Sequence, residues 1–442
     1  MEAPLNRPAP APSATACVES LDRDGRGVAR VDGKAVFIDG ALPGEVVEYA
    51  LFRGKRNYEL AQAVKVIKPS ASRVEPRCRY FGVCGGCSLQ HFDETAQVAA
   101  KQRVLEDALW HIGRVRAETM LAPVHGLHWR YRNRARLSAR NVPGKGGVLV
   151  GFRERKSTYV ADMSSCEVLP EAVSVLIPSL RRFIARLSIC DRLPQVEVVV
   201  ADEVTVLVLR ILSPLTAADE SVLREFAEDA GVHLWLQSKG PESVMPFWPE
   251  AMPPLYYSLP EFGLHIAFSP TDFTQVNSVV NRILVRRALA LLDPRPGERV
   301  GDYFCGLGNF TLPIARSGAL VTGYEGSDRM VARARENAEA NGLGRECRFE
   351  VADLADPKIC ATLRPLDKVL VDPPREGAIE AVKTFSRTRP RRIVYVSCDP
   401  ATLARDAGLM VNAQGYALRA AGIVNMFAHT SHVESLALFE RD

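Results

Sequence analysis

The sequence predicts a multidomain α/β protein whose last domain is a mostly parallel, doubly wound sheet. Three observations lead to this prediction. The chain has 442 residues, enough for two to four domains. Its N-terminal part alternates apolar and polar residues between glycine-containing turns, and its C-terminal part alternates strand and helix patterns. We therefore expect a disordered tail, a small β-barrel, a mixed α+β domain and an α/β domain, at residues 1–12, 13–70, 71–265 and 266–442 respectively.

Composition narrows the class of protein before any motif is considered. Hydrophobic residues make up 47% and charged residues 24%, which is typical of globular proteins and excludes a disordered or collagen-like chain. No run approaches about 18 uncharged apolar residues, so we expect no membrane span, and the Pro/Ala-rich N-terminus lacks a signal-peptide core. We expect a cytoplasmic protein, whose ten cysteines then favour metal ligation or catalysis over disulfides.

Positive charge gathers in two segments, although the net charge is only +4. Residues 53–79 carry +6 and residues 130–156 carry +8. Such segregation is typical of a surface that binds a polyanion. In the second segment four arginines recur with period two, and on a strand they would project from one face: Arg130, Arg132, Arg134 and Arg136. The alternative is a solvated edge strand whose charges oppose aggregation.

The first half of the chain predicts three kinds of local structure. Residues 15–67 alternate apolar and polar side chains and indicate an all-β barrel. A Cys/Gly-rich loop follows at 78–91, and a helical pattern over 93–113 ends at Gly113. Between 129 and 265 strand-like and helix-like runs are mixed.

Apolar runs in the second half alternate with helical patterns, which indicates a mostly parallel sheet. The predicted strands lie at 298–304, 319–326, 346–353, 367–375, 391–398 and 433–442. In such sheets ligands bind beyond the carboxyl ends of the strands. Five of these strands carry a carboxylate or a thiol near that end: Asp302, Glu325, Asp353, Asp372 and Cys398. Because the strands are neighbours in one sheet, the fold would bring these side chains together.

A glycine pair follows the first of these strands. The absence of side chains at Gly306 and Gly308 lets a ligand approach the backbone closely. Glu325 stands 19 residues after Gly306, the usual place for an acid that binds ribose hydroxyls, although Thr311 replaces the third glycine of the dinucleotide motif. Together these features favour an adenosine-containing cofactor. The alternative is an ordinary βα turn with a capping acid.

Two further strand ends are candidates for direct chemistry. Asp372 opens a Pro-Pro-Arg turn whose two prolines make it stiff, and the alternative reading is a purely structural turn. Cys398 precedes a predicted helix over 400–413, and a thiol near a helix N-terminus can have a lowered pKa and act as a nucleophile. A lone cysteine is otherwise often a buried apolar residue.

Three cysteines are closely spaced in the glycine-rich loop, as Cys78-x5-Cys84-x2-Cys87. Cys166 is the nearest unassigned cysteine downstream and is the candidate for a fourth ligand. The spacing resembles four-cysteine iron–sulfur ligation and favours a [4Fe–4S] cluster. Zinc is the rival because it also takes four thiolates, and disulfides are the remaining alternative.

Six motifs stand in one order along the chain: CRYFGVCGGCSLQH, FSPTDFTQVN, DYFCGLGNFTLP, VLVDPPREG, VSCDPATLARD and HVESLALFERD. Together they resemble the RNA 5-methyluridine methyltransferase family, and the cysteines bring the chain closest to its iron–sulfur branch, the 23S rRNA (uracil-C5)-methyltransferases. The resemblance implies a Rossmann-like methyltransferase domain that uses S-adenosylmethionine, an OB-like TRAM barrel that binds RNA and a mixed α+β iron–sulfur domain. It also implies that the helix at 93–113 packs on the methyltransferase domain.

The resemblance also assigns roles to residues. It implies Cys398 as the nucleophile and Glu434 as the base, with Phe273 stacking on the extruded uracil and Asp372 or Arg375 holding its edge. The residues expected to line the cofactor site are Gln275, Phe304, Gly306, Asn309, Glu325, Asp353 and Asp372.

The expected partner is 23S ribosomal RNA or its precursor, bound by a monomer with no membrane contact. A transfer-RNA 5-methyluridine enzyme is the first alternative, and a non-catalytic ribosome-assembly factor that binds RNA is the second. A radical enzyme is disfavoured, since its usual C-x3-C-x2-C spacing differs from the one found here.

Overall fold

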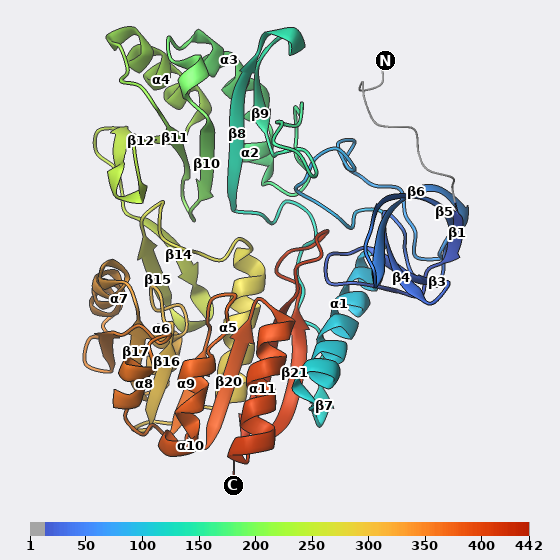
Figure 1. Cartoon of the computed structure of the whole chain (residues 1–442). Coiled ribbons are helices and arrows are strands. Elements are labelled where there is room, and N and C mark those ends of the chain that lie inside the picture. Colours follow the sequence, from blue (N-terminus) through green and yellow to red (C-terminus); the bar gives the residue numbers. More distant parts are fainter. Residues whose placement is uncertain (1–13, 442) are drawn as a thin grey trace.

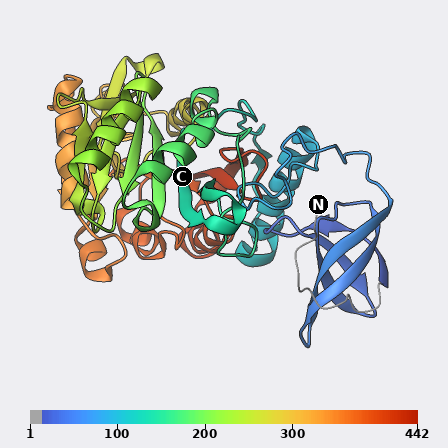
Figure 2. The same ribbon diagram turned by 90° about the horizontal axis from the view of Figure 1, so that it is seen from above.

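The computed structural model describes residues 14–441, and the expected tail at 1–12 lies outside them. The chain forms a six-stranded N-terminal barrel, a six-stranded central sheet, a two-stranded hairpin and an eight-stranded C-terminal sheet. Figure 1 shows the central sheet above the C-terminal sheet, with the barrel beside the junction between them. Seen from above, the barrel projects to one side of the other two domains (Figure 2).

The N-terminal barrel has the strand order β1-β5-β6-β4-β3-β2. Its alternating sequence buries one face of each strand, and Val36, Ile38 and Val47 are fully buried. The strands are β1 (Ala14–Cys17), β2 (Ser20–Leu21), β3 (Gly27–Val31), β4 (Lys34–Asp39), β5 (Val46–Gly54) and β6 (Tyr58–Lys68).

The central domain is a six-stranded sheet with helices packed on it, in the order β13-β12-β11-β10-β8-β9. Phe183 and Phe226 stack where two of the helices meet, with ring centroids 4.1 Å apart. Its strands are β8 (Arg134–Val142), β9 (Gly147–Gly151), β10 (Gln195–Val200), β11 (Thr205–Arg210), β12 (His233–Gln237) and β13 (Val244–Trp248). Its helices are α2 (Glu171–Ser174), α3 (Ile177–Arg186) and α4 (Ala217–Ala230), with 3-10 turns η2 (Pro143–Lys145), η3 (Cys190–Arg192) and η4 (Pro241–Ser243).

A hairpin leads from the central domain into the C-terminal domain. It consists of β14 (Leu255–Leu259), the 3-10 turn η5 (Pro260–Phe262) and β15 (Leu264–Phe268). The side chain of Asn337 in the C-terminal domain bonds both backbone groups of Ala267, which ties the hairpin to that domain.

The C-terminal sheet has the order β18-β17-β16-β19-β20-β22-β21-β7. Strands β16 to β20 are parallel, as predicted, whereas β22 is antiparallel to both of its neighbours. Strand β21 was not predicted, because it is buried almost throughout and so lacks the alternation that marks a half-buried strand. The strands are β16 (Arg299–Tyr303), β17 (Leu320–Glu325), β18 (Cys347–Val351), β19 (Lys368–Val371), β20 (Arg392–Ser397), β21 (Ala417–Val424), β22 (Glu434–Glu440) and β7 (Thr119–Met120).

Helices cover both faces of this sheet, and each face has its own hydrophobic core. On β19, Leu370 belongs to one core and Val369 to the other, as the alternation of a strand requires. The helices are α5 (Ser278–Leu292), α6 (Thr311–Ala315), α7 (Asp328–Ala340), α8 (Pro357–Thr362), α9 (Ile379–Lys383), α10 (Phe385–Thr388) and α11 (Pro400–Gln414).

The helix that precedes the central domain packs against the C-terminal domain. It runs as α1 (Glu94–Ala108) and continues as one π-helical turn, η1 (Leu109–Gly113), beside α11 (Figure 1). Gly113 permits this contact, because a Cβ there would lie 2.4 Å from the Ala404 carbonyl oxygen. Among the described residues, no helix has the length and hydropathy needed to span a bilayer.

Candidate active site

The sheet register brings the predicted nucleophile and base together. Cys398 follows the last residue of β20, and Glu434 is the first residue of β22. Ser397 and Ser435 are paired in the antiparallel ladder, so the residue after Ser397, which is Cys398, lies opposite the residue before Ser435, which is Glu434. Asp372 follows β19, the neighbour of β20, and completes a group of one thiol and two carboxyls.

Cys398 does not have the lowered pKa that its place before a helix predicts. Burial, together with the nearby Glu434 and Asp372 carboxyls, raises the pKa of the thiol to about 11, while Arg375 acts in the opposite direction. The helix N-terminus is already engaged, because the Asp399 carboxylate accepts a hydrogen bond from the Ala401 amide. The prediction was wrong because burial and two acidic neighbours outweigh a capped helix end.

Glu434 lies in an environment suited to proton transfer near neutral pH. Its side chain is 6% exposed, and burial together with Asp372 raises its pKa to about 8, against a lowering by Lys101. Burial also raises the pKa of Asp372 to about 7. Within residues 14–441, the Glu434 Oε2 atom has no hydrogen-bond partner. A buried polar atom without a partner is available to form a hydrogen bond with a group of the substrate.

The glycine loop after β16 closes onto the acid at the end of β17. Gly306 and Gly308 have φ of +55° and +94°, a region that side chains rarely adopt. The Gly306 amide donates to Glu325 Oε2 at 3.2 Å. Phe304 also has a positive φ, of +65°, which is uncommon for a bulky residue and points to a functional constraint on this turn.

Asn309 is held firmly inside the same loop. Its side-chain amide and that of Asn281 on α5 exchange two hydrogen bonds, of 2.9 and 3.0 Å, and the Tyr257 hydroxyl donates to Asn309 Oδ1 at 2.9 Å. Asp302 on β16 accepts a bond from the Thr311 hydroxyl, and burial raises its pKa to about 7. These bonds fix the turn in which a cofactor is expected.

The remaining predicted cofactor residues flank this turn. Gln275 lies on the loop between β15 and α5, where neighbouring Phe273 is 70% exposed and free to stack on a base. Arg134 holds this loop by donating to the carbonyl oxygens of Pro270 and Asp272. Asp353 follows β18, and its carboxylate accepts from the Ala355 amide at 2.9 Å, so it caps its own turn.

The four arginines predicted to project from one strand face do not all do so. Strand β8 begins only at Arg134, so Arg130 and Arg132 precede it. Arg130 has φ of +57° and is used structurally, since it donates to the Cys166 carbonyl oxygen and forms an ion pair with Glu171 at 2.7 Å. The period-two pattern could not reveal where the strand starts.

Arg134 and Arg136 do lie on one face of β8, and both contact Glu197 on β10, at 2.9 and 3.4 Å. Arg136 is largely exposed beyond this pair. Arg132 lies over the Phe152 ring and lines a large pocket.

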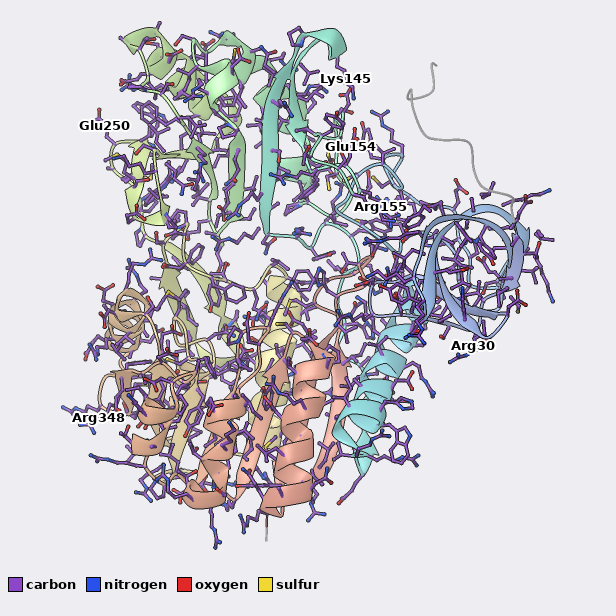
Figure 3. All side chains as sticks on the ribbon, viewed as in Figure 1. Arg30, Lys145, Glu154, Arg155, Glu250 and Arg348 are labelled. Carbon is purple, nitrogen blue, oxygen red and sulfur yellow. The ribbon has the colours of Figure 1, made fainter. Side chains whose placement is uncertain are left out.

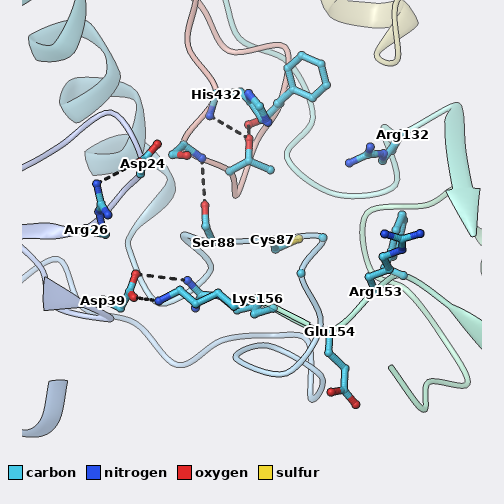
Figure 4. A pocket seen from close by; sticks show the side chains of 17 residues that line it. Asp24, Arg26, Asp39, Cys87, Ser88, Arg132, Arg153, Glu154, Lys156 and His432 are labelled. Atoms are coloured by element: carbon cyan, nitrogen blue, oxygen red, sulfur yellow. Dashed lines mark hydrogen bonds and ion pairs between the residues drawn. The ribbon is translucent and has the colours of Figure 1, made fainter. Parts of the chain in front are cut away.

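This junction pocket has a volume of about 640 Å³ and lies where the barrel, the central domain and the C-terminal domain meet. Figure 4 shows Arg132, Arg153 and Lys156 around it, with His432 from the C-terminal domain on the opposite side. Lys156 forms an ion pair with Asp39 of the barrel. His432 stands two residues before Glu434, and Arg375 acts on both His432 and the Cys398 thiol, which links the pocket to the candidate active site.

Not every cation of the 130–156 segment belongs to this junction. Arg155 lies where the central domain faces the barrel, whereas Lys145 lies at the far tip of the β8–β9 hairpin (Figure 3). Lys145 is nevertheless linked to the junction, because its ammonium lies 4.0 Å from a carboxylate oxygen of Glu154, which lines the pocket.

The four cysteines named above line one small buried cavity: Cys78, Cys84, Cys87 and Cys166. Burial and the other cysteines raise the pKa of Cys84 to about 11 and of Cys87 to about 12. Gly85 lets the loop wrap tightly, since a Cβ there would lie 2.9 Å from the Arg153 carbonyl oxygen. Four sulfurs facing one space fit a four-thiolate group. Within residues 14–441, no set of three or more His, Cys, Asp or Glu has the arrangement that holds a single metal ion.

Three residues of the site were not predicted: Lys101 on α1, Tyr257 on β14 and Asn281 on α5. Each is a polar residue within a helix or strand whose sequence pattern is ordinary, so the local sequence gives no sign of a functional role. Their roles follow only from the packing of distant segments around the site.

Comparison with known proteins agrees with this geometry. A family model described as tRNA (Uracil-5-)-methyltransferase matches residues 263–442, and a TRAM domain model matches residues 14–64. The 23S rRNA (uracil(1939)-C(5))-methyltransferase RlmD of Aromatoleum aromaticum is 59% identical over 430 residues, which cover 97% of this chain and 99% of that protein. The RlmD of Thiobacillus denitrificans is 60% identical, covering 96% and 98%.

One solved structure matches over nearly the whole chain. The tRNA (uracil-54, C5)-methyltransferase of Pyrococcus abyssi, in complex with S-adenosyl-L-homocysteine, has a TM-score of 0.73 and 25% identity, covering 96% of this chain and 100% of that one. The predicted methyltransferase fold and TRAM domain are thereby confirmed. The chain belongs to the RNA 5-methyluridine methyltransferase family.

Proposed function

We propose that this protein transfers a methyl group from S-adenosylmethionine to C5 of one uridine in 23S ribosomal RNA. The observation that carries the proposal is the grouping of Cys398, Glu434 and Asp372 at one sheet edge beside a glycine-rich cofactor turn. Relatives at 59% identity over nearly the full length are named for uracil 1939 of 23S rRNA, and we propose the same position here. The identity of 59% to these relatives, against 25% to the transfer-RNA enzyme, favours this substrate over transfer RNA.

Covalent catalysis makes the reaction possible, because C5 of uracil is a poor nucleophile. The Cys398 sulfur adds to C6, and electron density moves to C5. The thiol loses its proton as its sulfur adds to C6, and the Asp372 carboxylate, whose pKa is about 7, is the base that accepts this proton. S-Adenosylmethionine supplies the electrophilic methyl group that C5 then attacks.

The second half of the reaction restores the enzyme. C5 now carries both a methyl group and a proton, and the Glu434 carboxylate removes that proton. The electrons of the C5–H bond form the C5–C6 double bond, and the Cys398 sulfur leaves C6. A carboxyl with a pKa of about 8 is well matched to this exchange near neutral pH.

The target uridine must leave its stack to reach Cys398. Phe273, which is 70% exposed on the loop before α5, offers a face on which the base can stack. The arginines of the junction pocket offer contacts to phosphates, and the TRAM barrel borders the same pocket. We propose this junction as the RNA interface of a monomeric, cytoplasmic enzyme.

We also propose that the four cysteines hold a [4Fe–4S] cluster. The support is their shared buried cavity and the glycines that let the loop wrap around it. The cluster would hold the loop at 78–91 in place, since methyl transfer itself requires no electron flow.

A methyl-transfer assay tests the proposed function. The protein is incubated with labelled S-adenosylmethionine and either unmodified 23S RNA or unmodified transfer RNA, and the modified nucleoside is identified by mass spectrometry. 5-Methyluridine in 23S RNA alone is the expected result. Label in transfer RNA alone would contradict the substrate, and no label in either RNA would favour a non-catalytic assembly factor.

A further inference from the structure

Lys101 is a buried cation near the active site that the reaction scheme above does not use. It lies on α1, far in sequence from every catalytic motif, and is only 2% exposed. Its ammonium group donates to Asn425 Oδ1 at 2.7 Å and to the Phe427 carbonyl oxygen at 2.8 Å. A buried lysine costs considerable solvation free energy, so its retention calls for a reason.

The two bonds hold the ammonium close to the catalytic base. Asn425 directly follows Val424, the last residue of β21, and Val424 is paired with Glu434 in the antiparallel ladder. Lys101 therefore lies at the end of the same strand pair from which the Glu434 carboxyl emerges. Each group affects the other: burial lowers the pKa of Lys101 to about 7 against a raising effect of Glu434, and Lys101 in turn lowers the pKa of Glu434, which burial raises.

We propose that Lys101 is a positioning residue that increases the ionised fraction of the Glu434 carboxyl, which is the form able to remove the C5 proton. The inference rests on the proposed function. It extends that function by assigning part of the base's reactivity to a helix outside the methyltransferase motifs.

The other charged groups around Glu434 make this cation significant. Asp372, at the end of β19, opposes ionisation of Glu434, and the Cys398 thiol interacts with both carboxyls. Arg375 acts on the Cys398 thiol and on His432. Within residues 14–441, Lys101 is the cation that opposes the effect of Asp372 and lowers the pKa of Glu434.

Two histidines face Lys101 from the loop that joins β21 to β22. Lys101 lowers the pKa of both His429 and His432, and burial lowers them further, so both rings are neutral near pH 7. They add no positive charge near Glu434 at that pH. Removing the Lys101 charge should therefore shift Glu434 towards its protonated form.

Three variants separate the charge of Lys101 from its structural bonds. Lys101→Met removes the charge and both hydrogen bonds while keeping most of the volume. Lys101→Arg keeps the charge. Asn425→Ala removes one bond to the loop and leaves the ammonium in place.

The test is a rapid-quench experiment on the full-length protein with an RNA fragment that the wild type methylates. Methyl transfer into the covalent adduct and release of free 5-methyluridine RNA are measured separately from pH 6 to pH 9. We expect Lys101→Met to slow release about tenfold at pH 7, to move the midpoint of the release profile up by about one pH unit, and to leave methyl transfer nearly unchanged. Lys101→Arg and Asn425→Ala should keep the wild-type midpoint.

Two results would overturn the inference. One is an unchanged release midpoint in Lys101→Met, and the other is an equal loss of methyl transfer and release, which indicates a structural role. Failure of the wild-type protein to methylate any RNA would instead contradict the proposed function, so the two failures are distinguishable.

Discussion

The Ser88 amide donates a 2.8 Å hydrogen bond to the carbonyl oxygen of His429. This bond joins the cysteine loop to the loop between β21 and β22, which leads into Glu434. The His429 ring stacks on Trp129 with centroids 3.8 Å apart. The backbone of His429 has φ of +61°, which is uncommon for a residue other than glycine, so the surrounding contacts must hold this conformation. The cysteine loop is thus part of the support of the active site, although it takes no part in the chemistry.

Replacing the nucleophile should abolish the reaction. Cys398→Ala removes the sulfur that adds to C6, so methylation should fall below detection while S-adenosylmethionine still binds, because its expected site is the turn after β16. The measurements are nucleoside mass spectrometry and calorimetric binding of the cofactor. Turnover at the wild-type rate in this variant would exclude Cys398 as the nucleophile.

Replacing the base should separate methylation from product release. Glu434→Gln keeps the size of the side chain but cannot accept the C5 proton, so the methylated RNA should remain attached to Cys398. We expect release to slow by about 10²–10⁴-fold. Denaturing gels with labelled RNA will show a protein–RNA band in this variant. Equal release from variant and wild type would contradict the assignment.

The cysteine cavity should hold iron and sulfide when the protein is purified without oxygen. Cys84→Ser should lose the group and lower the melting temperature, because a metal group that binds only the folded chain stabilises it. Cys17→Ser is the matched control, since Cys17 is exposed and lies in the barrel. Stoichiometric zinc in place of iron would overturn the iron–sulfur assignment.

The amide pair between α5 and the glycine loop should support cofactor binding. Asn281→Ala removes both bonds of the pair and leaves the side-chain NH2 group of Asn309 without its acceptor, and we expect S-adenosylmethionine to bind more weakly by about 1–3 kcal/mol. Asn141→Ala, in the central domain, should bind the cofactor as the wild type does. Calorimetry measures both affinities, and equal values would show that Asn281 has no such role.

The cations of the junction pocket should contribute more to RNA binding than an exposed cation far from the pocket does. Arg132→Ala removes a cation that lines the pocket, so the affinity for RNA should fall and the salt dependence should lose about one unit of slope. Arg348→Ala removes an exposed cation from β18, the edge strand of the C-terminal sheet (Figure 3), and should change neither quantity. Binding titrations at several salt concentrations decide this, and an equal effect of both variants would argue against the junction as the interface.

Much of the site was determined by the sequence itself. The carboxyl ends of parallel strands meet at one edge, so alternating strand and helix patterns were enough to bring Glu325, Asp372 and Cys398 together. The close spacing of Cys78, Cys84 and Cys87 likewise restricts where their sulfurs can go, and the structure places them with Cys166 around one cavity.

Only the tertiary structure decided how these groups behave. The pKa of Cys398 is raised and not lowered, because burial and two carboxyls from other strands act on it. Arg130 leaves its expected strand to bind a carbonyl oxygen at Cys166, and Lys101 reaches the base from a helix more than 300 residues away in the sequence. The solvation and the charge of a group depend on the residues that pack around it. Packing between distant segments produces no periodic pattern in the sequence, so it could not be predicted.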